Sequence, residues 1–315
     1  MNPSIVVFGE TVVDLIGAQE ILGGAPFNVA RHLAALGEAP LFVTRVGADR
    51  HGDAVLAACH EFGIDCAGVQ RDSTHATGVA RVRMEPDGPH FDLADDAAFD
   101  HIEAAPAVRS LQALAGRTAL LYFGTLAQRG PVSRRALDAV RAARPLYACV
   151  DPNLREAPRD RAEMAGKLHG AAELKLSEQE LRQLLALAGL PCDLPVDAGL
   201  LDALARAFHL PQLQRLYWTC GERGSRCLCR GGQEALRVEA QAQPDVVDTV
   251  GAGDAYFAVV LLGRARGWPL PDTMRRAARF AAAICGVRGA VPADRRFYDA
   301  WREAFARTPE PTGQP

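Results

Sequence analysis

Short runs of branched and aromatic residues alternate along the chain with longer, alanine-rich amphipathic runs. Runs of the first kind predict β-strands, and apolar residues at helical spacing in the second kind predict α-helices. The expected strands are Ile5–Phe8, Leu41–Val46, Ala119–Phe123, Leu146–Val150, Glu173–Leu176 and Leu216–Thr219. The expected helices include Pro26–Leu36, Ala54–Phe62, Ser133–Arg144, Glu178–Ala188 and Leu201–His209. This alternation favours an α/β fold, in which helices cover both faces of a central, mostly parallel sheet.

One segment departs from this alternation. Residues 77–94 alternate around Pro86-Asp87-Gly88, which predicts a β-hairpin, and Thr11–Ile16 is also strand-like. Together they predict a small β lid outside the main sheet, formed by residues 10–22 and 76–96. Because the chain has no internal repeat and no low-complexity linker, residues 1–307 are interpreted as a single domain and residues 308–315 as a frayed tail.

Composition narrows the classes of protein. Apolar types make up 49% of the 315 residues, enough for a large core, and the net charge is −3 with both signs scattered, which argues against nucleic acid or a membrane surface as a partner. The N-terminal stretch lacks the pattern of a signal peptide, and the longest apolar run, Ala255–Gly263, is too short for a membrane span. The eight cysteines form no CxxC pair, so we expect a cytoplasmic protein. The histidines are dispersed, so we expect no His/Cys metal cluster.

The buried helix that the sequence predicts after residue 250 has an unusual entrance. Gly251, Ala252 and Gly253 carry almost no side chain, and Asp254 follows at once. Backbone N–H groups at a helix start attract an anion, and small residues let that anion approach. Because a carboxylate repels a resting anion, Asp254 suggests a base for a hydroxyl that attacks a phosphoryl group. The alternative is a plain glycine turn followed by an acid that the helix dipole favours.

The two common phosphate-binding motifs are missing. No GxGxxG follows the first strand, and the residues around Lys167 do not fit GxxxxGK[ST]. A dinucleotide-dependent dehydrogenase is therefore a distant alternative.

Four other stretches carry polar groups, and each has a structural alternative. The stretch 151-DPNLR-155 could hydrogen-bond a polyol or phosphate, or form a polar turn. The stretch 23-GGAPFNVA-30 allows close backbone approach beside Asn28, or forms a tight turn with proline in the first helical turn. Ser177 and Glu180 match a capping box. The stretch 219-TCGERGS-225 fits a nucleotide-binding turn or a β-hairpin turn.

In this order, the motifs resemble those of the PfkB, or ribokinase-like, family of carbohydrate kinases. The matching pieces are Gly9-Glu10 with Asp14, GGAPFNVA, 45-RVGADRHGD-53, Phe123-Gly124-Thr125, DPNLR, 175-KLSEQE-180, TCGERGS and 248-DTVGAGD-254. The form GGAPxNVA, together with DPNLR and KLSxxE, is most similar to fructokinases. The resemblance implies an ATP- and Mg²⁺-dependent enzyme that phosphorylates the primary hydroxyl of a small sugar, most simply the 6-hydroxyl of fructose.

The resemblance also implies a role for each matching residue. Asp254 would be the catalytic base, with the N–H groups of Gly251, Ala252 and Gly253 as an anion hole. The sugar would be bound by Asp14, Gly23, Gly24, Asn28, Arg155 and Asp254. The residues implied at the ATP site are Lys175, which with Lys167 makes up all the lysines of the chain, and Ser177, Thr219, Gly221, Gly224, Gly251, Gly253 and Ala282. Glu180 would bind Mg²⁺ through water, and Asp248 with the carbonyl of Val250 would bind K⁺.

The alternatives within the family are a ribokinase, a 2-keto-3-deoxygluconate kinase and a nucleoside kinase. A non-catalytic sugar- or nucleotide-binding protein on the same scaffold is the alternative from another class. Only eight residues separate Asp14 from Gly23, so we expect an abbreviated lid. A short lid leaves less surface for the lid-mediated homodimer that the resemblance implies, and the oligomeric state stays open.

Overall fold

A computed structural model of the chain describes residues 3–85, 88–114, 119–154, 160–191, 198–232, 235–241 and 245–306. Its centre is a nine-stranded sheet with the order β13-β12-β11-β10-β9-β8-β1-β4-β5. The strands are β1 (Ser4–Phe8), β4 (Leu41–Gly47), β5 (Val69–Asp72), β8 (Ala119–Phe123), β9 (Tyr147–Val150), β10 (Ala171–Ser177), β11 (Arg215–Thr219), β12 (Ser225–Cys229) and β13 (Leu236–Val238). From β5 to β11 the pairs are parallel, and β12 and β13 add antiparallel pairs at one edge. The six strands expected from the sequence are confirmed.

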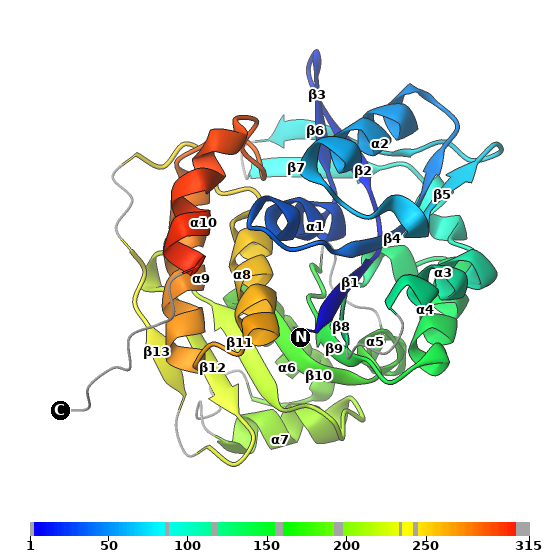
Figure 1. Ribbon diagram of the computed structural model, residues 1–315. Helices are drawn as coiled ribbons and strands as arrows, with labels where there is room; N and C mark the ends of the chain where they lie inside the picture. Colours follow the sequence, from blue (N-terminus) through cyan, green and yellow to red (C-terminus); the bar gives the residue numbers. More distant parts are fainter. Residues whose placement is uncertain are drawn as a thin grey trace.

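Helices lie on both faces of this sheet (Figure 1). They are α1 (Ala25–Ala35), α2 (Arg50–Phe62), α3 (Ala104–Ser110), α4 (Pro131–Ala143), α5 (Arg161–Leu168), α6 (Glu178–Ala188), α7 (Ala198–Ala207), α8 (Ala252–Arg266), α9 (Leu270–Cys285) and α10 (Asp299–Ala306). Alternate residues of β1 enter different cores: Ile5 and Val7 pack on the side of α1, α8 and α9, whereas Val6 and Phe8 pack on the side of α4, α6 and α7. No helix in the described ranges is long and apolar enough to cross a membrane.

Helix α8 is buried around its whole circumference. Residues 254–263 are all buried, and the helix packs against α1, α9 and the sheet. Figure 1 shows it between α1 and α9, with its neighbours on both flanks. A helix that is apolar on all sides is typical of the interior of a large domain. Its position is therefore fixed from every direction, and so is the position of its first turn.

A second, four-stranded sheet has the order β3-β2-β6-β7, with β2 (Val12–Ile16), β3 (Gln19–Gly23), β6 (Gly78–Glu85) and β7 (Gly88–Leu93). Strands β2 and β3 form one hairpin, β6 and β7 form another, and a parallel β2–β6 pair joins them. We call this sheet the lid sheet; it lies at the top of Figure 1, beyond the main sheet. Its existence was predicted, although β3 was not recognised as a strand, and the turn residues Pro86 and Asp87 lie outside the described residues.

The Asp49 carboxylate connects the start of α2 to the segment that enters the lid sheet. It accepts hydrogen bonds from the backbone N–H of Gly52 (2.8 Å), as a helix N-cap, and from the backbone N–H of Thr77 (2.8 Å). The hydroxyl of Thr77 donates to the same carboxylate at 2.8 Å. Burial raises the pKa of Asp49, but these hydrogen bonds outweigh it, so the net pKa is lowered.

We predict that Asp49→Ala lowers the free energy of unfolding by about 2 kcal/mol at pH 7, because a cap and two further hydrogen bonds are lost. A carboxyl whose folded pKa is lowered stabilises the protein above its unfolded pKa of about 4, and that stability is lost as the pH falls through the folded value. The difference from wild type should therefore shrink toward pH 2. Urea unfolding at several pH values measures this difference in the free energy of unfolding.

Asp65→Ala is the matched control, since Asp65 caps a single 3-10 turn through Ala67. This variant should lower the free energy of unfolding by about 0.5–1 kcal/mol. Equal losses of unfolding free energy in the two variants at pH 7 would contradict the role of Asp49 as both the N-cap of α2 and the acceptor for Thr77.

Candidate functional site

The first turn of α8 carries the residues that the sequence singled out. Gly251 is the N-cap, with a left-handed φ of 78°, and a Cβ at this position would lie 2.3 Å from the Cβ of Ala290. Only glycine therefore meets both the backbone conformation and the close packing. Asp254 follows in the first turn and is 7% exposed. A buried carboxylate thus lies at the positive end of a buried helix.

Lys175 reaches the same turn from the end of β10. A Cβ at Gly253 would lie 2.8 Å from the Nζ of Lys175, so the absence of a side chain at Gly253 makes room for the ammonium group. The ammonium group donates to both carboxylate oxygens of Asp151, at 3.0 and 3.1 Å. Asp151 follows β9, which is the parallel neighbour of β10. The carboxyl ends of two adjacent strands therefore meet the start of α8, where ligands of such sheets bind.

Charge at this point is unbalanced. Lys175 is 3% exposed and Asp151 is 0% exposed. Burial lowers the pKa of Lys175, but the carboxylates of Asp151, Glu180 and Asp254 raise it more, so the net pKa is raised and the ammonium group stays charged. Burial raises the pKa of Asp151 to about 7; Lys175 opposes this rise, and Glu180 and Asp254 add to it. Lys175 thus pairs directly with Asp151 and is within electrostatic range of Glu180 and Asp254, so carboxyl groups outnumber the ammonium group at the ends of β9 and β10, which favours a cation there.

On the other side of Asp254 lies a chain of polar contacts from α1. The amide nitrogen of Asn28 donates to the Asp254 carboxylate at 2.8 Å, and Arg31 donates to the amide oxygen of Asn28 at 2.6 Å. Arg31 also donates to the carbonyl of Leu22 at 2.7 Å, at the end of the lid hairpin. Burial lowers the pKa of Arg31 to about 10, although the charges of Asp254 and Asp14 are among those that raise it. Asp14 itself lies against Gly23, where a Cβ would be 2.8 Å from its Oδ2.

Ser177 and Glu180 form the capping box that was the structural alternative for this motif. The hydroxyl of Ser177 accepts from the N–H of Glu180 at 3.2 Å, and the Glu180 carboxylate accepts from the N–H of Ser177 at 2.7 Å. Its other oxygen accepts from the N–H of Leu154 at 2.8 Å. Glu180 therefore holds the turn after Asp151 against the start of α6.

The remaining residues assigned to the ATP site lie along the next part of the sheet edge. Thr219 pairs with Ser177 in parallel register, and the turn that contains Gly221 and Gly224 joins β11 to β12, as in the hairpin alternative. Arg223 of this turn forms an ion pair with Glu178 at the start of α6. Ala282 is half-buried in the last turns of α9.

Asp248 links the loop before α8 to the loop after α9. Its carboxylate accepts from the N–H of Val250 and the N–H of Gly289, both at 3.0 Å. The N–H of Val247 donates to the carbonyl of Cys285 at 2.8 Å, which fastens the same loop to the end of α9. Asp248 therefore holds the entrance of α8 in place.

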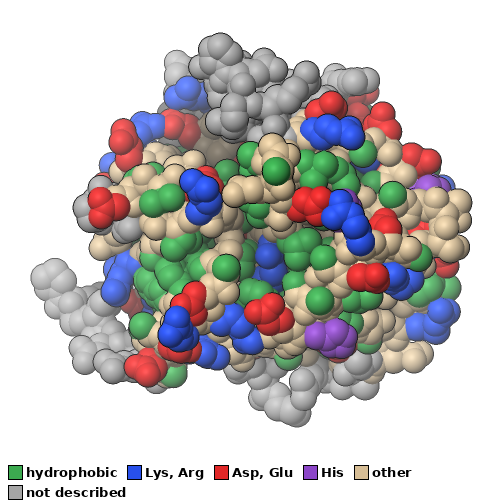
Figure 2. Space-filling model, turned by 90° about the horizontal axis from the view of Figure 1, so that it is seen from above, with side chains coloured by type: hydrophobic (Ala, Val, Ile, Leu, Met, Phe, Trp, Pro, Cys, Tyr) green, Lys and Arg blue, Asp and Glu red, His purple; other side chains and the backbone are tan. Residues whose placement is uncertain are grey.

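Of the predicted site residues, Asn28 and Lys175 contact the first turn of α8, and Asp248 lies in the loop just before it, whereas Arg155 lies outside the described residues. Two residues of this site were not assigned a role. Asp151 stood in the DPNLR motif, and Arg31 follows Asn28 by three residues, one helical turn, which is a spacing that could have indicated it. Two of the histidines that are dispersed along the sequence meet in the structure, since the ring centroids of His75 and His101 are 3.6 Å apart. On the face drawn in Figure 2, acidic and basic side chains are intermixed, as the composition indicated.

The chain is similar to known proteins over most of its length. The model of the pfkB family of carbohydrate kinases matches residues 2–295. A probable chloroplastic fructokinase of Arabidopsis thaliana, fructokinase-6, is 28% identical to this chain in an alignment that covers 93% of this chain and 80% of that protein.

Two solved structures share the fold. The fructokinase of Vibrio cholerae O395, solved with fructose, ADP and a calcium ion, matches 97% of this chain and 99% of its own, with a TM-score of 0.74 and 23% identity. The nucleoside kinase of Burkholderia thailandensis, solved with inosine, matches 97% and 100% of the two chains, with a TM-score of 0.76 and 19% identity. The predicted ribokinase-like α/β fold is confirmed. Because the family model spans nearly the whole chain, the protein belongs to the pfkB family of carbohydrate kinases, enzymes that transfer a phosphoryl group to a sugar hydroxyl.

Proposed function

We propose that this kinase transfers the γ-phosphoryl group of ATP to the 6-hydroxyl of fructose. The observation that carries the proposal is the buried Asp254 carboxylate at the start of α8, with Asn28 on one side and Lys175 beside Gly253 on the other. Relatives named fructokinases support the choice of sugar, at 28% identity for the plant protein and 29% for that of Klebsiella pneumoniae. The neighbour from Vibrio cholerae holds fructose and ADP together.

The sugar would lie between the lid sheet and α1. Asp14 and Asn28 would offer a carboxylate and an amide to the hydroxyl groups. Gly23 and Gly24 would contact the ring through their backbone, and the space that a side chain would take there is filled by Asp14 and by residues 10–12. Arg31 would act through Asn28, because its guanidinium group orients the amide oxygen. Arg155 is a further proposed ligand from the turn after β9. This arrangement would place the 6-hydroxyl beside Asp254.

The γ-phosphoryl group would lie against the N–H groups of Gly251, Ala252 and Gly253. The carboxylate of Asp254 takes the proton of the 6-hydroxyl as its oxygen forms a bond to phosphorus, the bond from phosphorus to the bridging oxygen breaks, and ADP leaves. The ammonium group of Lys175, held by Asp151, faces the charge that develops on the phosphoryl oxygens. Ser177, Thr219, Gly221, Gly224 and Ala282 would line the ATP site.

The donor set at the end of β9 and β10 fits Mg²⁺. Asp151 and Glu180 provide carboxylate oxygens, the type of ligand that Mg²⁺ prefers, and the site has more negative than positive charge. Both oxygens of Glu180 already accept backbone N–H groups, so Glu180 would hold the ion through water. An ion held there beside the nucleotide would neutralise charge on the phosphates. Asp248 and the carbonyl of Val250 are the residues that we propose for K⁺.

The substrate is tested by ADP release from Mg-ATP with fructose, ribose, 2-keto-3-deoxygluconate and inosine, each with and without K⁺. We expect the highest kcat/KM for fructose. A higher value for inosine would make the protein a nucleoside kinase, and a sugar that binds without any ADP release would make it a binding protein.

We predict that Asp254→Asn lowers kcat by about 10²–10⁴-fold, because the general base is lost while the shape of the side chain is kept. ATP binding and the melting temperature should change little. Asp202→Asn, an exposed substitution on α7, is the control that should leave turnover intact. Unchanged turnover in Asp254→Asn would remove Asp254 from the mechanism.

We predict that Lys175→Met lowers the free energy of unfolding by about 3–5 kcal/mol at pH 8, because Asp151 is left buried without its partner. The loss should be smaller at pH 5. A carboxyl whose folded pKa is raised costs stability as the pH rises above its unfolded pKa, and protonation of Asp151 relieves this cost. The double variant Lys175→Met/Asp151→Asn should recover most of the stability.

The other lysine is the matched control for this test. Lys167 pairs with the half-exposed Glu163 one helical turn away, at 2.7 Å, so Lys167→Met should cost about 0.5 kcal/mol or less at both pH values. Urea unfolding of the four proteins measures the difference. A loss in Lys175→Met that does not depend on pH, or that the double variant does not recover, would contradict the proposed coupling.

A further inference from the structure

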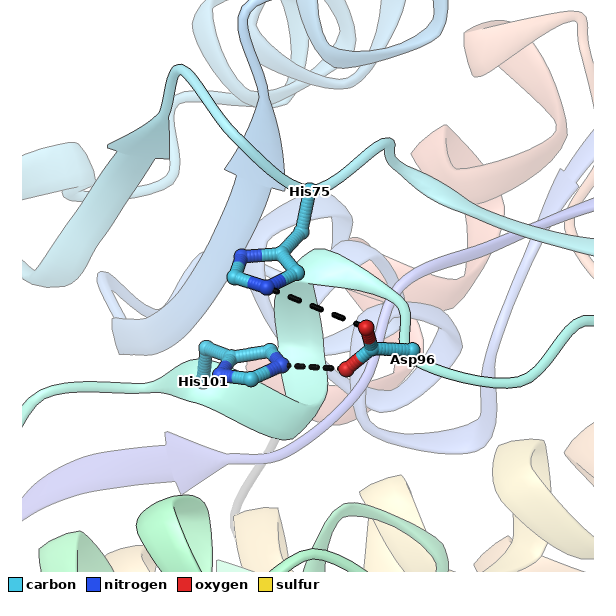
Figure 3. A group of neighbouring side chains, drawn as sticks. All are labelled: His75, Asp96 and His101. Carbon is cyan, nitrogen blue, oxygen red and sulfur yellow. Dashed lines mark hydrogen bonds and ion pairs between the residues drawn. The ribbon is translucent and has the colours of Figure 1, made fainter.

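Two segments connect the hairpin of β6 and β7 to the main domain, and side chains from both meet at one place. His75 lies on the entering segment, between the end of β5 and the start of β6. Asp96 and His101 lie on the leaving segment, after the end of β7. Figure 3 shows the three side chains pointing toward one another from different parts of the chain. We call them the hinge cluster.

The ligand atoms of the hinge cluster all lie within 4.8 Å of one another. The Nε2 of His101 is 2.7 Å from Oδ1 of Asp96, and the Nε2 of His75 is 3.9 Å from Oδ2 of the same carboxylate. The side chains of His75 and His101 are 25% and 26% exposed, and that of Asp96 is 73% exposed. The two imidazole rings are therefore sheltered, while the carboxylate remains open to ions from solution.

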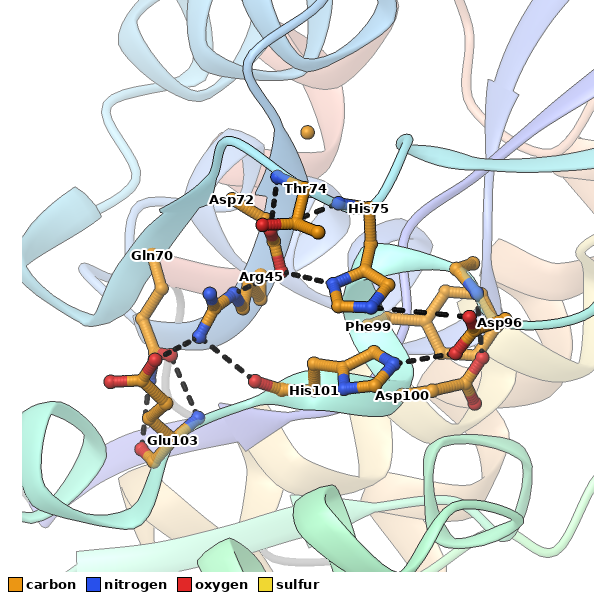
Figure 4. A network of polar contacts seen from close by, with 12 residues as sticks. Arg45, Gln70, Asp72, Thr74, His75, Asp96, Phe99, Asp100, His101 and Glu103 are labelled. Carbon is orange, nitrogen blue, oxygen red and sulfur yellow. Dashed lines mark hydrogen bonds and ion pairs between the residues drawn. The ribbon is translucent and has the colours of Figure 1, made fainter.

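The other ring nitrogen of His75 is already held by a carboxylate. Its Nδ1 lies 2.9 Å from Oδ2 of Asp72, which is buried and also pairs with Arg45 at 2.7 Å (Figure 4). The Asp72 carboxylate accepts a hydrogen bond from Nδ1 of His75, which places the proton on that nitrogen and leaves the lone pair on Nε2, on the side of the hinge cluster. A carboxylate behind the ring is the usual support of a metal-binding histidine.

Acidic groups predominate around the hinge cluster. Glu103 and Asp100 lie beside it in Figure 4, and they are paired with Arg45 and Arg129 respectively. Asp72 and Asp96 add two further carboxylates. This surplus of negative charge favours a cation.

We propose that the hinge cluster binds a divalent transition metal ion of the Zn²⁺ type, through the Nε2 atoms of His75 and His101 and the carboxylate of Asp96, with water as a further ligand. Imidazole with carboxylate suits Zn²⁺, Co²⁺ and Ni²⁺, whereas Mg²⁺ prefers oxygen ligands alone. The ion would join the entering and leaving segments of the hairpin. Metal binding at the hinge cluster does not depend on a bound sugar or on the kinase reaction, so it is independent of the proposed function.

Binding requires a small rearrangement of the hinge cluster. The two rings are stacked with an angle of 12° between their planes, whereas each ring must point its nitrogen at a common ion. Ligand atoms bound to tetrahedral zinc lie about 3.3 Å apart, so the rings must turn about their side-chain bonds. Asp96 has a left-handed φ of 53°, a conformation that the surrounding structure holds in place. That conformation aims its carboxylate back at the two histidines.

Titration of metal-stripped protein with Zn²⁺ by calorimetry, and with Co²⁺ by visible absorption, at pH 7.5 tests the proposal. We expect one ion per chain, displaceable by a chelator and unaffected by Mg²⁺. His75→Gln and His101→Gln should each weaken binding by at least about 100-fold, and Asp72→Asn by about 10–100-fold. Binding should weaken at pH 5.5, since protons compete for the imidazole nitrogens. Zn²⁺ should also slow hydrogen exchange in both segments, residues 73–77 and 94–101.

His60→Gln, an exposed histidine on α2, is the matched control and should bind as wild type does. The cysteines are the competing ligands, and an absence of thiolate charge-transfer bands in the Co²⁺ spectrum excludes them. Melting temperatures without metal show that each variant is folded. Failure to bind one ion more tightly than about 1 mM, or retained binding in His101→Gln, overturns the proposal. In that case the cluster is a direct hydrogen-bonded link between the two segments.

Discussion

The burial of α8 from Asp254 to Gly263 is the constraint on which the site depends. The first N–H groups of any helix lack intrahelical partners, and water satisfies them when the helix end is exposed. Here the helix is packed on all sides, and its first turn lies against Ala290, Lys175 and Asn28. One N–H group of this turn, that of Ala252, donates to the carbonyl of Thr249 at 3.3 Å, and the turn lies at the carboxyl edge of the sheet, where we propose that the phosphoryl group binds. The same packing gives Asp254 a low-dielectric setting, where a charge acts strongly.

The polar side chains that contact the first turn of α8 are each held in place by a second charged residue. Lys175 is held in place by Asp151, and Asn28 by Arg31, so each group that touches the first turn of α8 has its own support. Supported side chains lose little freedom when a substrate arrives. The carboxylates near Lys175 outnumber the positive charges there, so this part of the protein attracts a cation.

The sequence was sufficient to predict the central strands, but it predicted the edge strands poorly. Strands buried on both faces are continuous apolar runs, which is why Ala119–Phe123 and Leu216–Thr219 were found. The edge strands Val69–Asp72 and Gln19–Gly23 contain exposed polar residues and gave no such signal. Motif residues were found, but their contacts were not. Asn28 and Asp254 are 226 residues apart, and His75 and His101 meet because two segments converge in space, which no local pattern encodes.

The lid sheet is assembled from two insertions that are far apart in the chain. One lies between β1 and α1, the other between β5 and α3, and the parallel ladder from Val12↔Gly78 to Leu15↔Arg81 joins them. Neither the β2–β3 hairpin nor the β6–β7 hairpin would be stable as a sheet alone, because β2 or β6 would then be an unpaired edge strand. In recombination between relatives, the two insertions would therefore have to be inherited together. A crossover between them would produce a catalytic domain with one native lid hairpin, whose unpaired strand edge could pair with another chain and promote aggregation.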